Sequence, residues 1–222
     1  LQSQILTDPA VKEMKDYHEW LERQVRKNPN IIVNLETTVT PEMIADIDPD
    51  STIVAVGAKQ IIPPIPGIEK ATMAFNVFGH EDEVGKKVVI VGGGDIGCEL
   101  SIHLSGMGHT CSVVEMTHFQ AGNAELSIRM SILQFMEKEN VTTYLDTTAT
   151  EITDNGVYIQ NENGKQFLEA DTVIVCVGTE PLETERDSFR HCCYEVINVG
   201  DCKKASNMQH AIETGFDAGL IL

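Results

Sequence analysis

Apolar and polar positions in the middle of the chain follow the periods of alternating strands and helices. Residues 88–91 are a short apolar run of strand length, residues 110–114 form a second expected strand, and residues 96–107 between them carry apolar side chains at helical spacing. An amphipathic helix over residues 124–139 and a strand over residues 141–145 come next. This alternation predicts a parallel β-α-β-α-β unit.

A different period follows this unit. Residues 148–153, 156–161 and 166–168 alternate between apolar and polar positions with the period of a strand. Asp154-Asn155-Gly156 and Asn163-Gly164 between them are hairpin turn signals. We therefore expect an antiparallel meander, followed by a further strand at residues 172–177.

The two ends of the chain predict parts of a second α/β domain. The expected elements are a helix over residues 9–27, strands over residues 31–35, 53–56 and 195–199, and a helix from about residue 207 to 222. Asn28-Pro29-Asn30 ends the first helix, and Pro63-Pro64-Ile65-Pro66-Gly67 is a stiff connector that can be neither helix nor central strand. A domain boundary is expected soon after this connector.

Composition and charge limit the partners of the chain. With 222 residues, of which 42% are apolar, it can bury the core of one large or two modest domains. Asp and Glu outnumber Lys and Arg by 34 to 16, and a surface with a net charge of −18 repels phosphate backbones and anionic lipids. The apolar runs fall far short of the roughly 20 residues of a membrane helix. We therefore expect neither nucleic acid nor a membrane as a partner.

The cysteines and the N-terminus favour a cytoplasmic protein without a metal site. The six cysteines include no C-x-x-C pair and no zinc-like spacing with histidine, so free and mostly buried thiols are expected. A disulfide between the adjacent Cys192 and Cys193 would be strained. Leu1-Gln2-Ser3-Gln4 lacks the basic and apolar segments of a secretory signal, and we interpret it as a position inside a longer chain.

The motif that carries chemistry is a glycine-rich turn between the first strand and helix of the central unit. Its G-x-G-x-x-G pattern assigns Gly92 to a tight turn, Gly94 to the close approach of a pyrophosphate, and Gly97 to close packing of helix on strand. The anion then lies at the positive end of the helix dipole. The predicted dinucleotide-binding residues of this turn are Gly92, Gly93, Gly94, Asp95, Ile96 and Gly97.

Glu115 and Met116 follow the second strand of the unit. The acid lies about 20 residues after the turn, where this motif holds the hydroxyl pair of a ribose. A carboxylate accepts hydrogen bonds from a free 2′-OH and repels a 2′-phosphate, and no Arg follows Glu115 closely. The sequence therefore favours NADH over NADPH. His118 near the ribose would soften this preference, although we interpret it as a solvated loop histidine.

Segments outside the central unit resemble a known family. Ala55-Val56-Gly57 resembles the crossover motif of two-dinucleotide-binding-domain flavoproteins, and Gly178 lies in the counterpart on the return. Gly200-Asp201, with Met208-Gln209 on the next helix, resembles the C-terminal FAD signature of that family. The chain is most similar to the C-terminal half of NADH:flavin oxidoreductases related to 2,4-dienoyl-CoA reductase, 2-enoate reductase and trimethylamine dehydrogenase.

The resemblance implies a fold and a set of cofactors. The fold is α/β, with a Rossmann-like NAD(P)-binding domain over residues 81–180 inserted into an incomplete FAD-binding domain over residues 1–80 and 181–222. The implied FAD contacts are Ala55, Val56, Gly57, Gly178, Gly200, Asp201, Met208 and Gln209. We expect the motif for the FAD pyrophosphate upstream of Leu1, so FAD binding by this chain alone should be weak or absent. FMN and a 4Fe-4S cluster would belong to a barrel outside this chain.

The implied reaction passes a hydride from NADH to FAD and electrons on to the cluster and FMN. Because this step needs orientation more than acid–base chemistry, no catalytic side chain is nominated. A structural ADP- or NAD-binding module without turnover is the alternative. A disulfide reductase of the thioredoxin-reductase type is disfavoured, since the chain lacks its C-x-x-C. The sequence does not identify the terminal substrate. It also allows more than one oligomeric state, and a homo-oligomer is one of them.

Overall fold

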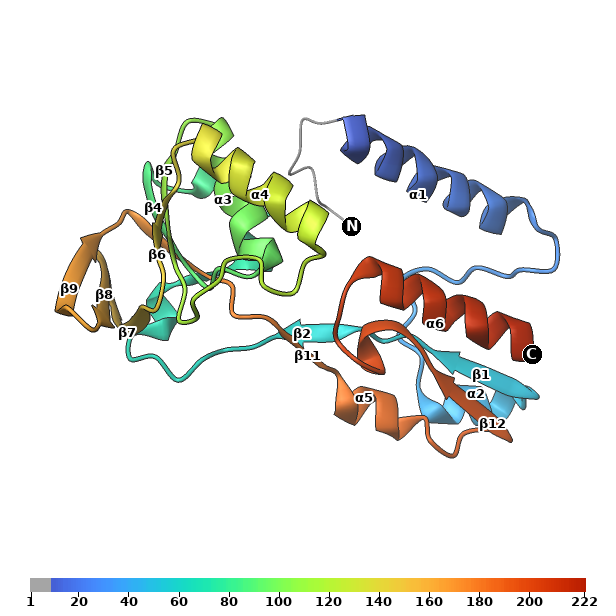
Figure 1. The fold of residues 1–222 in the computed structure, drawn as a ribbon. Helices are drawn as coiled ribbons and strands as arrows, with labels where there is room; N and C mark the ends of the chain where they lie inside the picture. Colours follow the sequence, from blue (N-terminus) through green and yellow to red (C-terminus); the bar gives the residue numbers. More distant parts are fainter. Residues whose placement is uncertain (1–8) are drawn as a thin grey trace. The chain divides into compact units, whose positions relative to one another are not determined.

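The computed structural model describes residues 9–222, which form two compact units (Figure 1). One unit is built from residues 9–23 and 60–178, and the other from residues 24–59 and 179–222. The expectation about Leu1–Gln4 falls outside the described residues. The division into cofactor domains at residues 80 and 180 stays a prediction, because it concerns which cofactor each part holds.

The first unit is organised around a parallel sheet with the strand order β3-β10-β4-β5-β6. Its strands are β3 (Thr72–Met73), β4 (Lys87–Val91), β5 (Thr110–Val114), β6 (Thr142–Tyr144) and β10 (Thr172–Val175). Helix α3 (Asp95–Gly106) joins β4 to β5, and helix α4 (Leu126–Lys138) joins β5 to β6. Val91 pairs with Val114, so β4 and β5 end level with each other. The predicted β-α-β-α-β unit is confirmed.

The two faces of this sheet are covered by different elements. Ile90 and Val113 point into a core that they share with α3 and α4, whereas Val91 and Val114 point into a core shared with an antiparallel meander. Figure 1 shows the helices on one side of the sheet and the meander on the other. The meander strands are β7 (Thr148–Thr153), β8 (Gly156–Asn161) and β9 (Gly164–Glu169). Burial on both faces explains the continuous apolar run at residues 88–91 of β4.

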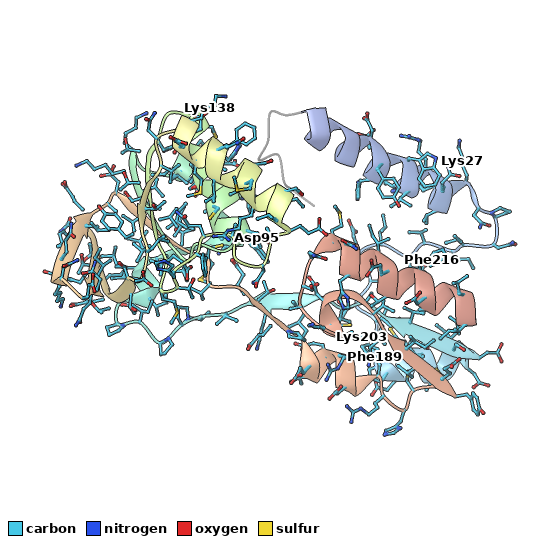
Figure 2. The ribbon with its side chains drawn as sticks, in the orientation of Figure 1. Lys27, Asp95, Lys138, Phe189, Lys203 and Phe216 are labelled. Carbon is cyan, nitrogen blue, oxygen red and sulfur yellow. The ribbon has the colours of Figure 1, made fainter. Side chains whose placement is uncertain are left out.

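The second unit contains a parallel pair of strands, β1 (Ser51–Val54) and β12 (Glu195–Asn198). Its other elements are the helices α2 (Pro41–Ile47), α5 (Glu183–Ser188) and α6 (Met208–Ile221), and the 3-10 turn η4 (Gly200–Cys202). The buried core is small, formed by Val54, Phe189 and Cys202. Phe216 on α6, labelled in Figure 2, is 66% exposed. This unit therefore leaves much apolar surface uncovered.

Short elements connect the larger ones. Strands β2 (Ala58–Gln60) and β11 (Thr179–Pro181) pair with each other where the chain passes between the units. Lys59 and Glu180 on these strands form an ion pair of 3.2 Å. The 3-10 turns η1 (Ile68–Lys70), η2 (Ala74–Asn76) and η3 (Glu81–Glu83) lie between β2 and β4. Among the described residues, no helix is both long enough and apolar enough to cross a membrane.

The N-terminal part of the chain corrects one prediction. Helix α1 (Pro9–Lys27) ends directly before Asn28-Pro29-Asn30, as expected. The prediction of a strand over residues 31–35 is wrong: their backbone is irregular, and Ile32 is 85% exposed. A strand needs a neighbour for its N–H and C=O groups, and within residues 9–222 none pairs with this segment.

Helix α2 was not predicted, although the sequence signals its start. The side chain of Thr40 accepts a hydrogen bond from the backbone N–H of Met43, and Pro41 occupies the first helical position. A threonine cap followed by proline is typical of a helix N-terminus.

Candidate functional site

Two glycines of the turn after β4 are required by the fold itself. Gly92 has a φ of 109°, in a region that side chains rarely adopt, and a side chain there would collide with the carbonyl oxygen of Cys176. A side chain at Gly97 would collide with the carbonyl oxygen of Gly92. The turn therefore folds tightly against the ends of β4 and β10, and α3 begins close to the strand that precedes it.

Gly94 differs from these two glycines. Its φ of −68° suits any residue, it is exposed, and a side chain built there would meet nothing within 4 Å. It is the N-cap of α3, and no side chain caps the helix. The fold does not need glycine at this position, whereas an anion that approaches the free N–H groups of the first helical turn would need the open space.

Hydrogen bonds fix the conformation of Gly93. Its N–H donates to Glu115 Oε2 at 2.6 Å. Its carbonyl oxygen accepts hydrogen bonds from the N–H of Ala121 at 2.8 Å and from the thiol of Cys98 at 3.2 Å. The turn is thus held from the end of β5, from the loop after β5 and from α3. A binding loop that is ordered in advance loses less conformational entropy when a ligand binds.

Glu115 follows directly after β5 and is half-buried. Its Oε2 accepts the Gly93 bond and its Oε1 accepts a hydrogen bond from the N–H of Thr117 at 2.7 Å. An ionised carboxylate offers about four acceptor directions, so both oxygens can accept further donors. The side chain is therefore held in place beside the glycine turn with capacity left for the hydroxyl groups of a sugar.

The loop from Met116 to Glu125 extends the site away from the turn. Met116 is 71% exposed. The guanidinium of Arg129 on α4 lies 4.9 Å from the centre of the Phe119 ring, and its Nε donates to the carbonyl oxygen of Gln120 at 2.9 Å. An exposed apolar side chain and an aromatic ring close to Glu115 form a surface on which a planar base can stack.

Two acids at the start of α3 shape the electrostatics of the turn. Burial raises the pKa of Asp95, and its Oδ1 atom is buried without a hydrogen-bond partner in the described part of the chain. Figure 2 labels Asp95 at the end of α3 where the helix begins. Burial and the charge of Asp95 together raise the pKa of Glu99. The surroundings of both carboxyl groups thus disfavour their ionised form.

The cysteines are free thiols, as expected. Burial raises the pKa of Cys98 and of Cys176 to about 12, so both thiols stay protonated near neutral pH and are poor nucleophiles. Cys192 and Cys193 are partly exposed and form no disulfide with each other. The thiols near the glycine turn therefore serve packing and hydrogen bonding.

The residues predicted to contact FAD occupy loops and helix ends. In the second unit, Ala55, Val56 and Gly57 follow β1, Gly200 and Asp201 lie in η4, and Met208 and Gln209 open α6. Gly178 follows β10 in the first unit and its carbonyl oxygen accepts a hydrogen bond from Ile61 at 3.0 Å. The assignment of all these residues to FAD stays a prediction.

The second unit satisfies the FAD signature only in part. Asp201 Oδ1 accepts a hydrogen bond from the N–H of Ser206 at 3.2 Å, and its carboxylate retains acceptor capacity for a hydroxyl chain. The start of α6 is capped by Asn207, whose side chain accepts from the N–H of His210 at 2.9 Å. No described strand of this unit leads through a glycine-rich turn into a helix. A cradle for the FAD pyrophosphate is therefore not among the described residues.

The sequence-based prediction missed two acidic side chains, one on α3 and one beside the loop after Glu115. Glu99 lies one helical turn after Asp95, a spacing that could have revealed it. Asp146 reaches the loop after Glu115 from the connection between β6 and β7, where its Oδ2 lies 2.8 Å from Nδ1 of His118. No local sequence signal marks that contact.

Comparison with known proteins places this chain in a described family. Residues 10–191 match the family described as pyridine nucleotide-disulphide oxidoreductase. A bilirubin reductase of Mediterraneibacter gnavus is 33% identical over 217 residues, which cover 96% of this chain and 34% of the relative. An NADH oxidase of Thermoanaerobacter brockii is 28% identical, over 94% of this chain and 33% of the relative.

Solved structures agree with the sequence matches. A 2-naphthoyl-CoA reductase in complex with 2-naphthoyl-CoA superposes with a TM-score of 0.89 at 25% identity, over 96% of this chain and 33% of that one. Histamine dehydrogenase from Rhizobium sp. 4-9 shares the fold, with a TM-score of 0.79 at 14% identity, over 95% of this chain and 36% of that one. The chain thus spans about a third of the length of the proteins it matches.

Proposed function

Because the chain belongs to the pyridine nucleotide-disulphide oxidoreductase family, we propose that the unit of residues 60–178 binds NADH at the glycine turn after β4. One observation carries the proposal. Helix α3 has no side-chain cap at its N-terminus, and its N-cap position is Gly94, a glycine that the fold does not require. Beside the turn lies the carboxylate of Glu115, which two backbone N–H groups already hold in place. This combination suits a pyrophosphate next to a ribose.

Each part of the cofactor has a proposed partner. Gly94 and the first N–H groups of α3 would hold the pyrophosphate. Glu115 would accept hydrogen bonds from the hydroxyl groups of the adenosine ribose, and Met116 and Phe119 would provide an apolar surface for the adenine. A 2′-phosphate would meet the charge of Glu115 directly, which favours NADH over NADPH.

These residues bind and orient the nucleotide. When bound, NADH supplies a hydride from its nicotinamide ring to a flavin. Glu115 and the start of α3 would hold the adenosine end and so help to orient the cofactor for that transfer. We nominate no general acid or base, because the thiols near the turn stay protonated and the hydride transfer needs none.

For the longer protein we propose a chain of redox groups. FAD would be held by the second unit through Asp201 and the start of α6, together with a pyrophosphate cradle supplied from outside this chain. FMN and a 4Fe-4S cluster would lie in a barrel outside this chain as well. The relatives are about three times as long as the matched region, which leaves room for such parts. A cytoplasmic location, and the absence of nucleic acid and membrane partners, remain part of this proposal.

Anaerobic titration of the longer, flavin-loaded protein with NADH tests this function. We expect the flavin absorbance near 450 nm to bleach in proportion to the NADH added, because the nicotinamide reduces the flavin. Binding of NADH without bleaching would support the alternative, in which the glycine turn holds ADP or NAD as a structural ligand. The same titration of a Gly94→Val variant provides the control, since bleaching should then require far more NADH.

The chain of 222 residues by itself is expected to purify without stoichiometric FAD. Its described residues offer Asp201 and α6 but no glycine-rich phosphate cradle in the second unit, and phosphate contacts supply much of the affinity for a dinucleotide. The absorbance ratio at 450 and 280 nm of the purified chain, with and without added FAD, measures the bound flavin. A yellow preparation with one FAD per chain would show that the second unit binds flavin without that cradle.

A further inference from the structure

An ion pair lies beside the ribose end of the proposed site and has no role in it so far. Nδ1 of His118 is 2.8 Å from Oδ2 of Asp146, and both side chains are mostly exposed. Backbone hydrogen bonds hold the two loops together: the N–H of Asp146 donates to the carbonyl of Thr117 at 3.1 Å, and the N–H of Thr147 donates to the carbonyl of Glu115 at 3.0 Å. Asp146 is therefore fixed next to the loop that begins at Glu115.

The charged groups around His118 come from three elements. Glu115 and His118 belong to the loop after β5, Asp146 to the connection between β6 and β7, and Arg129 to α4. Arg129 is engaged by the Phe119 ring and by the carbonyl of Gln120, and the Phe119 ring packs edge-on against His118 with 5.3 Å between the ring centres. Arg129 and His118 are thus both engaged by other protein groups.

We propose that Asp146 is a specificity-determining residue that holds His118 in an ion pair and so withholds it from a 2′-phosphate. This inference rests on the proposed function, because it takes the adenosine ribose to lie at Glu115. A 2′-phosphate bound there needs a cation to offset its charge. To bind His118, the phosphate would have to displace the Asp146 carboxylate. It would also have to approach Glu115 and Asp146 at the same time. NADH, with a free 2′-OH, needs no cation and is unaffected.

Asp146→Asn removes the charge and keeps the shape. Asp146 has a φ of 49°, a conformation that asparagine also tolerates, so the loop should keep its backbone. Without the Asp146 charge, His118 is free to donate a hydrogen bond to a 2′-phosphate. We therefore expect the variant to bind NADPH about ten-fold more tightly than the parent chain. The affinity for NADH should change by less than about two-fold.

A matched control uses the other exposed pair of histidine and carboxylate on this unit. Nδ1 of His80 lies 3.2 Å from Oε1 of Glu83, away from the residues of the glycine turn in sequence. Glu83→Gln removes the same charge from a similar pair and should leave both nucleotide affinities unchanged. A double variant, Asp146→Asn with His118→Ala, should lose most of the gain in NADPH affinity.

The test is a set of fluorescence titrations of the 222-residue chain and its variants with NADH and NADPH at one pH. A gain in NADPH affinity that requires His118, with little change in the NADH affinity, supports the inference. An unchanged NADPH affinity in Asp146→Asn, an equal gain in Glu83→Gln, or a gain that survives in full in the double variant would overturn it. If the parent chain binds no NADH, the proposed function itself fails, a result distinct from NADH binding with an unresponsive Asp146→Asn.

Discussion

Replacement of Gly94 by valine is expected to weaken NADH binding by at least about 100-fold and to leave the fold unchanged. The side chain would fill the space through which the pyrophosphate reaches the start of α3, where the loss of two charge-assisted hydrogen bonds accounts for a factor of this size. The fold should tolerate it, because the φ of Gly94 is −68° and a side chain there meets nothing within 4 Å. Isothermal calorimetry with NADH and the far-ultraviolet circular dichroism spectrum measure the two effects.

The matched control is Gly106→Val at the opposite end of α3. Gly106 is also exposed and also has nothing within 4 Å of an added side chain, so it carries the same substitution on the same helix away from the turn. It should keep the parent affinity for NADH. If Gly94→Val kept its affinity with an unchanged spectrum, the nucleotide would have to bind elsewhere.

The exchange of Glu115 for arginine is expected to reverse the preference between the two nucleotides. Arginine supplies a cation for the 2′-phosphate and removes the carboxylate that accepts the ribose hydroxyls, so the ratio of the two affinities should change by about 100-fold in favour of NADPH. Glu115 also accepts hydrogen bonds from the N–H groups of Gly93 and Thr117. Loss of the Glu115 carboxylate removes these hydrogen bonds and loosens the turn. The affinity for NADH should therefore fall further than the change of charge by itself explains.

Glu115→Gln separates these two effects. The amide oxygen can still accept a hydrogen bond from Gly93, whereas the negative charge is lost. We expect this variant to bind NADH within about ten-fold of the parent chain and to reject NADPH less strongly. Calorimetric titrations of both variants with both nucleotides provide the ratios. An unchanged ratio in Glu115→Arg would show that this acid does not face the ribose.

The central unit could be predicted from the sequence because its signals are local. Residues 88–91 of β4 are buried on both faces and are apolar throughout, and Gly92, Gly97 and Glu115 lie at fixed sequence separations from β4 and β5. The meander was also predictable, because glycine-containing turns separate its strands.

The remaining features depend on contacts between distant segments. Residues 31–35 have the composition of a strand, but a strand forms only against a neighbour, and the described residues provide none. The bond from Ala121 to Gly93 and the pair of His118 with Asp146, which are 28 residues apart, follow from how loops meet at the end of the sheet. Such contacts leave no periodic pattern in the sequence, so the specificity proposed for Asp146 required the structure.

The central claim is that the glycine turn and Glu115 form a binding site for NADH. Calorimetric titration of the unaltered chain with NADH and with NADPH tests it most directly. The account predicts saturable binding of one NADH per chain, with an affinity at least about ten-fold higher than that for NADPH, because a carboxylate at the ribose repels the 2′-phosphate. Equal dissociation constants for the two nucleotides, or no saturable binding of NADH, would contradict it.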